Sequence, residues 1–363
     1  MGLARQYPRV EIDLAGIRHN ARNIVRRCRE HGIRVTGVTK GACGHPAIAR
    51  AMLEGGVWRL ADSRLLNLER LRNAGITAEM VLIRIPMPSE VPHVPEVADS
   101  SLNSEIETIR ALGDRAASLG KTHGIVLMVD VGERREGVMP ERVMDISREI
   151  VRTRGVRLEA LGTNVACFNA VLPTRKNVQI VVDLAREVGR DLGIEVGVSG
   201  GNTATTVLLD REEMPDGVTE LRIGEGILLG TDISNDRRIP GAFPDTFILA
   251  AQVVELQEKP SMPEGETGYD AFGLRPAFVD RGTRRRAIVA VGKQDVEVSG
   301  LTPVDRGIEI VGASSDHLVL DVDDAEKDIR LGDIIRFSVN YPAMLRLMTS
   351  DYVEKVFHKR GGA

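Results

Sequence analysis

The 363-residue sequence is poor in aromatic side chains, in cysteines and in long apolar runs. Aromatic residues make up 3% of the chain, which argues against the stacking platforms that bind single-stranded nucleic acid. The three cysteines include no CxxC pair and do not make a disulfide framework. No segment approaches the ~18 apolar residues of a membrane span, and the N-terminus lacks the apolar part of a signal peptide. We therefore expect a cytoplasmic protein.

Charge of one sign is also lacking. The formal net charge is -4, from 48 basic and 52 acidic residues without a block of like charge. Such a balance gives no attraction to nucleic acid or to an anionic membrane, and neither partner is expected. The hydrophobic fraction of 42% and the length suit two cores, because an α/β barrel takes ~250 residues and leaves ~100 for a second domain.

From residue 33 onward, short β-branched segments alternate with longer segments of helical periodicity. Eight such units in tandem predict a parallel sheet, and eight strands close a (β/α)₈ TIM-type barrel. An open doubly wound sheet is the alternative. The expected strands are Arg34–Thr39, Val57–Ala61, Met80–Ile85, Val97–Leu102, Gly124–Asp130, Arg157–Gly162, Ile194–Val198 and Glu220–Ile223.

The alternation stops near Gly230, and the segment SNDRRIPGAFPD (residues 234–245) predicts a linker. A mainly-β domain is expected beyond it. The strand Arg9–Leu14 has no place among the eight and is expected to join that domain. The predicted domains are therefore a barrel over 15–235 and a C-terminal β-domain over 236–363, with 1–14 added to the latter. Its expected strands are Phe247–Gln257, Arg286–Val291, Val296–Ser299, Gly307–Val311, His317–Val322 and Ile334–Ser338.

Polar residues follow nearly every expected barrel strand. The active site of such a barrel lies on its C-terminal face, so these side chains should converge there. They are Lys40, then Asp62 and Ser63, then Arg84, Asn103, Asp130 with Arg134, Arg135 and Glu136, then Asn164 with Cys167, the segment Ser199–Thr203, and finally Arg222 with Gly224.

Lys40 ends the first apolar strand, in VTGVTKGACGHP. Desolvation at the end of a buried strand would favour the neutral, nucleophilic amine that a Schiff base with an aldehyde requires. Taken alone, Lys40 could equally be a structural lysine whose ammonium reaches solvent.

Two glycine-containing segments, SGGNTATT after strand seven and RIGEG after strand eight, face that lysine in the predicted barrel. Glycines let the backbone approach an oxyanion closely, and the loops after strands seven and eight are the usual phosphate site of these barrels. Two ordinary turns before helix caps are the structural alternative. Together with Lys40, the two segments favour a phosphate-bearing cofactor.

In order, these motifs resemble those of the alanine-racemase fold family, and most closely its ornithine-racemase-like branch, over nearly the whole chain. The resemblance rests on VTKGACGHP, VDVGERREGV, GTNVACF, SGGNT and LRIGEG, and in the β-domain on GKQDV, GASSDHLVLDV and NYPAMLRLMTS. It implies pyridoxal 5'-phosphate (PLP) bound to Lys40, with Arg135 near the phenolic oxygen, Asn164 on the pyridine ring, Arg222 at the pyridine nitrogen, and Asn202, Thr203, Gly224, Glu225 and Tyr341 at the phosphate.

The resemblance further implies an amino-acid racemase, an isomerase that removes and returns the Cα proton, and a homodimer with shared active sites. Arg222 supports racemisation, because a guanidinium keeps its proton and leaves the pyridine nitrogen unprotonated, which makes the ring a weaker electron sink. The alternatives are a decarboxylase, aldolase or dehydratase of the same fold, a non-catalytic PLP-binding protein, and an unrelated sugar-phosphate barrel enzyme. The β-domain argues against the PLP carrier, because such carriers keep only the barrel.

The chain departs from the family at the second catalytic base. The tyrosine of the family's GYxDG motif is absent, and Gly292-Lys293-Gln294-Asp295 stands there. The lysine before the Asp-Thr-Gly motif of many relatives is Met128 here. The candidates for the second base are Lys293, Tyr269, His317 and Cys43.

A cationic substrate such as ornithine, lysine or arginine is expected from the branch that the chain resembles. Asp295 and Asp316 lie in its two distinctive β-domain motifs and could select an ammonium tail. The spacing of Cys43, His45 and Cys167 is not a zinc pattern, and no metal is expected.

Overall fold

The computed structural model describes residues 7–358 and divides into two compact units. One unit is Leu14–Pro244; the other combines Met1–Asp13 with Asp245–Ala363. Residues 1–6 and 359–363, which belong to the expected β-domain, lie outside the described residues. Within the described part, no helix has the length and apolar composition needed to cross a bilayer.

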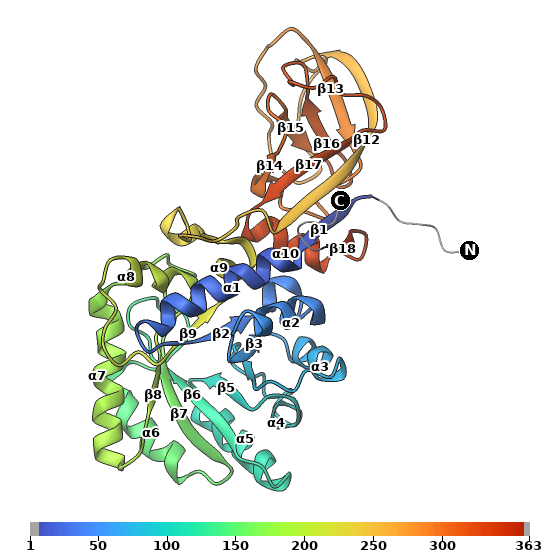
Figure 1. Cartoon of the computed structure of the whole chain (residues 1–363). Helices are drawn as coiled ribbons and strands as arrows, with labels where there is room; N and C mark the ends of the chain where they lie inside the picture. Colours follow the sequence, from blue (N-terminus) through green and yellow to red (C-terminus); the bar gives the residue numbers. More distant parts are fainter. Residues whose placement is uncertain (1–6, 359–363) are drawn as a thin grey trace. The chain divides into compact units, whose positions relative to one another are not determined.

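The first unit is a closed barrel of parallel strands surrounded by helices (Figure 1). The predicted barrel is confirmed, and the open doubly wound sheet is excluded. The strands are β2 (Arg34–Val38), β3 (Arg59–Asp62), β4 (Met80–Leu82), β5 (Ser100–Asn103), β6 (His123–Met128), β7 (Val156–Gly162), β8 (Gly197–Ser199) and β9 (Glu220–Ile223).

The helices that cover the barrel differ in length. The short α8 and α4 leave long stretches of irregular chain between their neighbouring strands. The helices are α1 (Leu14–Arg29), α2 (Pro46–Glu54), α3 (Leu65–Asn73), α4 (Val94–Val97), α5 (Ile106–Ser118), α6 (Val143–Arg152), α7 (Arg175–Leu192), α8 (Val207–Asp210) and α9 (Glu225–Leu229).

One layer of the barrel interior is polar. The Arg59 guanidinium is buried and pairs with Glu220 at 2.7 Å and with Glu159. Burial alone would raise the pKa of Glu220, but Arg59 and the Thr36 hydroxyl outweigh burial and hold this pKa below its usual value. The buried charges are tolerated because each has its partner in place.

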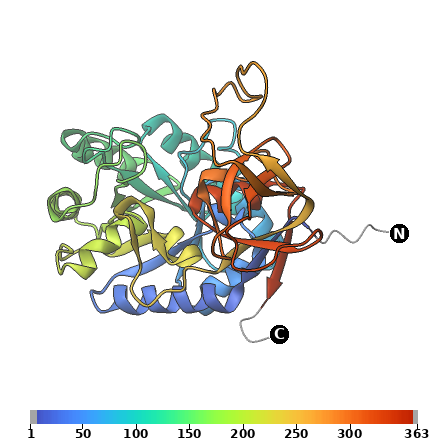
Figure 2. The same ribbon diagram turned by 90° about the horizontal axis from the view of Figure 1, so that it is seen from above.

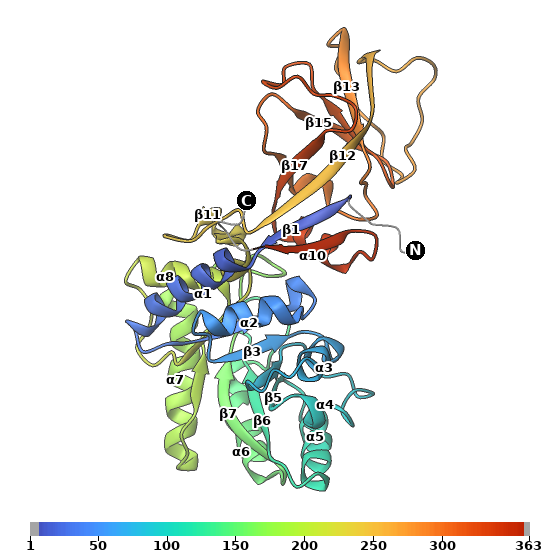
Figure 3. The same ribbon diagram turned by 45° about the vertical axis from the view of Figure 1, so that its right-hand side comes forward.

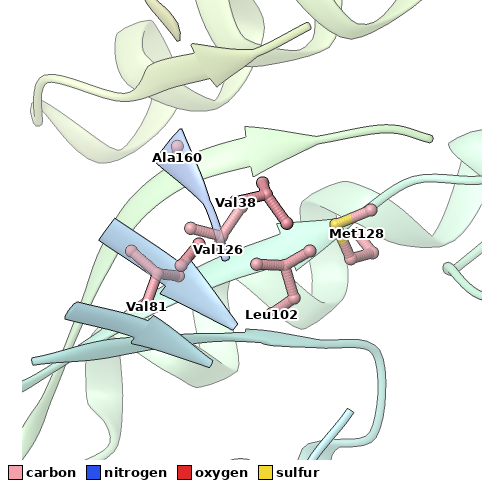
Figure 4. Close-up of a cluster of buried hydrophobic side chains, with 7 residues drawn as sticks. Val38, Val81, Leu102, Val126, Met128 and Ala160 are labelled. Atoms are coloured by element: carbon pink, nitrogen blue, oxygen red, sulfur yellow. The ribbon is translucent and has the colours of Figure 1, made fainter. Parts of the chain in front are cut away.

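An apolar cluster fills the barrel interior next to that layer, with Val38, Val81, Leu102, Val126, Met128 and Ala160 in contact (Figure 4). Met128 and Ala61 are completely buried in it. Its side chains come from β2 to β7, so the cluster ties neighbouring strands together. The polar residues that follow these strands are therefore attached to strands whose positions this packing fixes.

The segment predicted as a linker packs on the barrel. Its Phe243 ring stacks on His19 of α1 with the ring centroids 4.3 Å apart, and the Phe243 N–H donates to Asn20 Oδ1 at 2.7 Å. Within the segment, the short strand β11 (Arg237–Arg238) pairs with β10 (Thr231–Asp232). The barrel unit extends to Pro244, so nearly all of the segment belongs to the barrel and the connection to the second unit falls at its end.

The second unit is a mainly antiparallel sheet in the order β14-β17-β12-β13-β16-β15. The N-terminal β1 pairs antiparallel with β12 and parallel with β18, as Figure 3 shows for β1 and β12. The elements are β1 (Arg9–Asp13), β12 (Phe247–Pro260), β13 (Thr283–Val289), β14 (Leu301–Pro303), β15 (Glu309–Ala313), β16 (Leu318–Asp321), β17 (Ile334–Val339), α10 (Tyr341–Thr349) and β18 (Glu354–His358).

Sequence patterns were less reliable in this unit. The predicted strand Val296–Ser299 is wrong, because a 3₁₀ turn begins at Val298 and hydrogen bonds tie the preceding residues into turns. Helix α10 was not predicted, although Asn340 caps it by accepting from the Ala343 N–H at 3.1 Å. The long connection between β12 and β13 projects from its unit as the orange loop of Figure 2.

Candidate active site

Hydrogen bonds with residues of β3 and α3 hold the loop that contains Lys40. Lys40 begins a 3₁₀ turn directly after β2, and the preceding Thr39 is buried with its hydroxyl donating to Asp62 Oδ2 at 2.7 Å. Arg70 of α3 donates to the Cys43 carbonyl. The Lys40 side chain is exposed, so the predicted desolvation of its amine is wrong for the barrel as it stands. The neighbouring residues of the loop are thus fixed, and the Lys40 side chain is accessible to a ligand.

Asp62 anchors this loop from inside the protein. Its carboxylate is buried and accepts from the Arg64 N–H at 3.0 Å and from Asn67 Nδ2 at 2.9 Å. Burial raises the pKa of Asp62 to about 6, although its hydrogen bonds and the charge of Lys40 act in the opposite direction. A Cβ at Gly44 would lie 2.7 Å from the Asn67 Cβ, so only glycine permits this close packing.

Arg222 links the loops that follow β7 and β8. Its guanidinium is buried, with Nη1 donating to Ser199 Oγ at 2.5 Å and Nη2 donating to the Thr163 carbonyl at 2.6 Å. Burial lowers the pKa of Arg222, and the nearby Glu220 carboxylate opposes that shift. The side chain remains a cation, since guanidinium does not deprotonate in proteins.

The two predicted phosphate segments are close-packed where their glycines stand. Gly201 has φ +128°, and a Cβ on Gly224 would lie 3.3 Å from the Val38 Cβ. Thr203 Oγ1 accepts from the Gly226 N–H at 3.2 Å, which ties the two segments together. Both segments lead into short helices, whose first N–H groups have no intrahelical acceptor. The glycines thus allow the segments to pack closely on the barrel, and the backbone N–H groups that begin the short helices could donate to a ligand.

Asn202 acts differently from the sequence prediction. Its Nδ2 donates to Asn164 Oδ1 at 2.9 Å and to the Val165 carbonyl at 2.8 Å, while its Oδ1 accepts from the Ala204 N–H at 2.9 Å. The amide is therefore engaged with the protein, and a phosphate contact would come from the Thr203 hydroxyl or from the backbone. Asn202 instead joins the phosphate loop to Asn164.

The Glu225 side chain is also engaged. Its carboxylate accepts from Thr231 Oγ1 at 2.8 Å and from the Ile233 N–H at 2.9 Å. Burial raises the pKa of Glu225 to about 7, with a contribution from the neighbouring Asp232 charge. The carboxylate is bound to the chain beyond α9, so the contact that Glu225 offers a phosphate is its backbone N–H.

Arg135 lies on the loop after β6 with an exposed side chain. Its guanidinium forms an ion pair with Glu136 and donates to Cys167 Sγ. The hydrogen bonds that Arg135 donates to the Glu136 carboxylate raise the pKa of Arg135.

Glu133 was missed by the sequence analysis. Its carboxylate is 2% exposed and accepts five backbone N–H bonds from the loop after β7, at residues 166–169 and 171. Burial would raise the pKa of Glu133, but these N–H donors outweigh it and lower the pKa. Gly132 and Gly137, both at positive φ, indicate a tightly turned loop around Glu133. No sequence pattern indicates that the Glu133 carboxylate binds the loop after β7.

The remaining predicted residues lie in the second unit. Lys293 Nζ is 3.4 Å from Asp270 Oδ2 and stands over the Phe272 ring at 4.1 Å from its centroid. The adjacent Tyr269 is 76% exposed. His317 Nδ1 lies 3.4 Å from the Asp316 carboxylate. Three candidates for the second base are thus on the surface of this unit.

The two distinctive β-unit motifs meet through their backbones. The Lys293 N–H donates to the Ser314 carbonyl and the Gln294 N–H donates to the Ser315 carbonyl, both at 2.9 Å. Asp295 is 4% exposed and accepts from Ser350 Oγ at 2.6 Å, and its role in selecting a substrate cation stays a prediction.

Tyr341 is the first residue of α10 and is partly buried. Lys40, Arg135, Asn164, Asn202, Thr203, Arg222, Gly224 and Glu225 all lie in the barrel unit. Within residues 7–358, no group of three or more His, Cys, Asp or Glu side chains has an arrangement that could hold a metal ion.

A family model and similar curated proteins both relate the chain to amino-acid racemases. Residues 12–232 match the family described as alanine racemase, N-terminal domain. The chain is 41% identical over 351 residues to ornithine racemase of Acetoanaerobium sticklandii, covering 96% of this chain and 99% of the relative. It is 40% identical over 352 residues to lysine racemase of Thermotoga maritima, covering 97% and 98%.

Solved structures share the fold over almost the whole length. Alanine racemase of Clostridium difficile 630 superposes with a TM-score of 0.77 at 20% identity, covering 99% of this chain and 98% of that one. D-threonine aldolase from Filomicrobium marinum gives 0.71 at 18% identity, covering 94% and 88%. With the barrel, the placement of its motifs and these relatives in agreement, the chain belongs to the alanine racemase family.

Proposed function

We propose that the protein is a PLP-dependent racemase that interconverts the L- and D-forms of a free cationic amino acid such as ornithine or lysine. The observation that carries the proposal is the near full-length similarity to ornithine racemase and lysine racemase. The barrel unit supports it with an accessible Lys40 and a buried Arg222 that follow strands joined in the same closed barrel.

The residues of the barrel unit fit PLP chemically. Lys40 would hold the cofactor through its amine, and Arg222 would face the pyridine nitrogen. Thr203 and the backbone of Gly224 and Glu225 would bind the phosphate, because the glycines at these loops allow close approach. Asn164, fixed by Asn202, would lie against the ring.

When bound, PLP supplies an electron sink for removal of the substrate Cα proton. Lys40 moves that proton on one face, because its loop is fixed by Asp62 while its amine stays accessible. Arg222 donates a hydrogen bond without giving up its proton, since its guanidinium stays charged. Arg135 would donate to the phenolic oxygen of the cofactor through the N–H groups that Glu136 and Cys167 leave free.

Either a second base acts on the opposite face or Lys40 serves both faces alone. Lys293, Tyr269 and His317 remain the candidates from the second unit, with Cys43 on the Lys40 loop. Loss of a base that serves one enantiomer should slow proton exchange from that enantiomer far more than from the other. Deuterium wash-in from separate L- and D-substrates, in single variants of the four residues, would identify the base. Equal slowing in both directions for all four would contradict the two-base scheme.

We also propose a homodimer in which both subunits contribute to each active site. The support is membership of the family together with the exposed side chains of Tyr269 and His317 in the second unit. Mixing a Lys40→Ala chain with a chain inactivated in its second base should restore part of the activity, because one of the mixed sites is complete. Sedimentation that shows a fully active monomer would exclude this arrangement.

The test of the function is a chirality-resolved panel of free amino acids with PLP added. We expect racemisation of ornithine or lysine to exceed that of alanine. Borohydride reduction of the PLP-loaded protein should fix the cofactor on the Lys40 peptide, and Lys40→Ala should abolish both labelling and turnover. Absence of racemisation for every amino acid, or labelling of another lysine, would refute the assignment.

A further inference from the structure

Arg135 and Glu136 form a two-point ion pair. The Glu136 carboxylate accepts from both Nε and Nη2 of Arg135, and Nη1 donates to Cys167 Sγ. These contacts use three of the five N–H donors of a guanidinium and fix the plane of the group. Glu136 is half-buried, with 20% of its side chain exposed.

Glu136 is the carboxylate on this loop that is available to Arg135. Glu133 is occupied by backbone N–H groups of the loop after β7. Asp130 accepts from the Gly132 N–H at 2.8 Å and the Arg134 N–H at 3.2 Å, and its ion pair is with Arg134. The Arg135 guanidinium therefore depends on Glu136 for its negative partner.

The same carboxylate acts on Arg222. Burial is the main influence that lowers the pKa of Arg222, while Glu136 raises this pKa and Arg135 lowers it further. Removing the charge of Glu136 would leave the Arg135 guanidinium without its carboxylate partner.

We propose that Glu136 is a positioning residue of the active site: its two-point ion pair fixes the plane of the Arg135 guanidinium. The remaining Arg135 N–H donors are then held ready for the anionic groups of cofactor and substrate. The inference rests on the proposed function, because it assigns Arg135 to the PLP site.

The test compares Glu136→Gln, Arg135→Lys and the double variant with a control, Glu141→Gln. Glu141 is an exposed carboxylate five positions along the chain, with no ion pair among the described residues. Three quantities are measured: the dissociation constant of PLP from titration of the cofactor-free protein, the pH dependence of the visible absorption of the loaded protein, and kcat and KM in both directions.

We expect Glu136→Gln to lower kcat/KM by about tenfold to hundredfold, the range set by loss of charge-assisted hydrogen bonds. It should also shift the pH dependence of the visible absorption, because the positive charge beside the cofactor is no longer balanced. The double variant should be no worse than Arg135→Lys, since Glu136 acts through Arg135. Glu141→Gln should match the wild type in all three measurements.

Wild-type values for Glu136→Gln, or independent multiplying effects in the double variant, would overturn the inference. Should Glu136→Gln fail to fold by circular dichroism, Glu136→Asp keeps the charge but shortens the reach, and a change in the same direction is expected. If the wild type racemises no amino acid, the proposed function fails. The absorption and PLP measurements still decide the role of Glu136 in that case.

Discussion

Replacement of Glu133 by glutamine should loosen the loop after β7. In the wild type, Oε1 accepts from the N–H groups of Cys167, Phe168 and Asn169, and Oε2 accepts from Ala166 and Val171, both at 3.2 Å. The amide of glutamine keeps one acceptor oxygen and presents an NH₂ group to the other donors. Two or three backbone N–H groups then face a donor instead of an acceptor.

Each buried N–H that loses its partner costs about 1–3 kcal/mol, which sets a range of about 2–6 kcal/mol for two. Because residues 167–170 are exposed and water can reach them, we expect the low end of this range, about 2–3 kcal/mol. Amide hydrogen exchange at residues 166–171 should quicken by the corresponding factor of about 30–150. Glu213→Gln, at an exposed glutamate, serves as the control.

The effect should also depend on pH. The pKa of Glu133 lies below its ordinary value of 4.5, because the backbone donors outweigh burial. Its stabilising contribution is therefore complete above pH 4.5 and is lost as the pH falls through the lowered pKa. The difference in unfolding free energy between wild type and Glu133→Gln should shrink in that acid range. Unchanged exchange at residues 166–171 in Glu133→Gln would refute the reasoning.

Three further predictions concern the barrel. Asp62 has a pKa raised to about 6 from 3.8, so the folded protein binds its proton more tightly; urea unfolding of the wild type should show a stability gain from pH 7 toward pH 5 that Asp62→Asn lacks. Gly201→Ala should lower the free energy of unfolding by about 1–3 kcal/mol and weaken PLP binding, because φ is +128° and the new Cβ would lie 2.2 Å from Thr205 Oγ1. Gly193→Ala, at φ +65° with nothing within 4 Å of the new Cβ, tests the backbone effect alone. An equal loss of PLP binding in both variants would contradict the crowding argument. Arg222→Lys should cut kcat/KM by about tenfold to hundredfold while Lys40 still takes up PLP, since lysine keeps the charge but loses the fork that binds Ser199; unchanged kinetics would exclude a role at the cofactor.

The order of strands and helices along the barrel could be predicted from the sequence. Period and residue type distinguish buried parallel strands from amphipathic helices, and eight repeats leave a closed barrel as the natural solution. Strand β5 was the weakest prediction and was placed too early. Ser100 and Ser101 are buried there, and the apolar residues before them form α4 instead.

The location of the candidate site could be predicted as well. Residues that end parallel strands must lie on one face of the barrel, which brings Lys40, Arg222 and Gly224 to the same end without knowledge of any side-chain contact. The motif order added the identity of the cofactor and the substrate class through a resemblance, and the comparisons support the family.

The sequence by itself determined the barrel, its C-terminal face and the residue types present there, because these follow from local periodicity and from the direction of parallel strands. Only the tertiary structure decided which partner each polar side chain takes. The five donors to Glu133, the engagement of Asn202 and the pairing of Arg135 with Glu136 depend on loop conformations. Loop conformations are set by contacts between segments distant in the sequence, and no local pattern records such contacts.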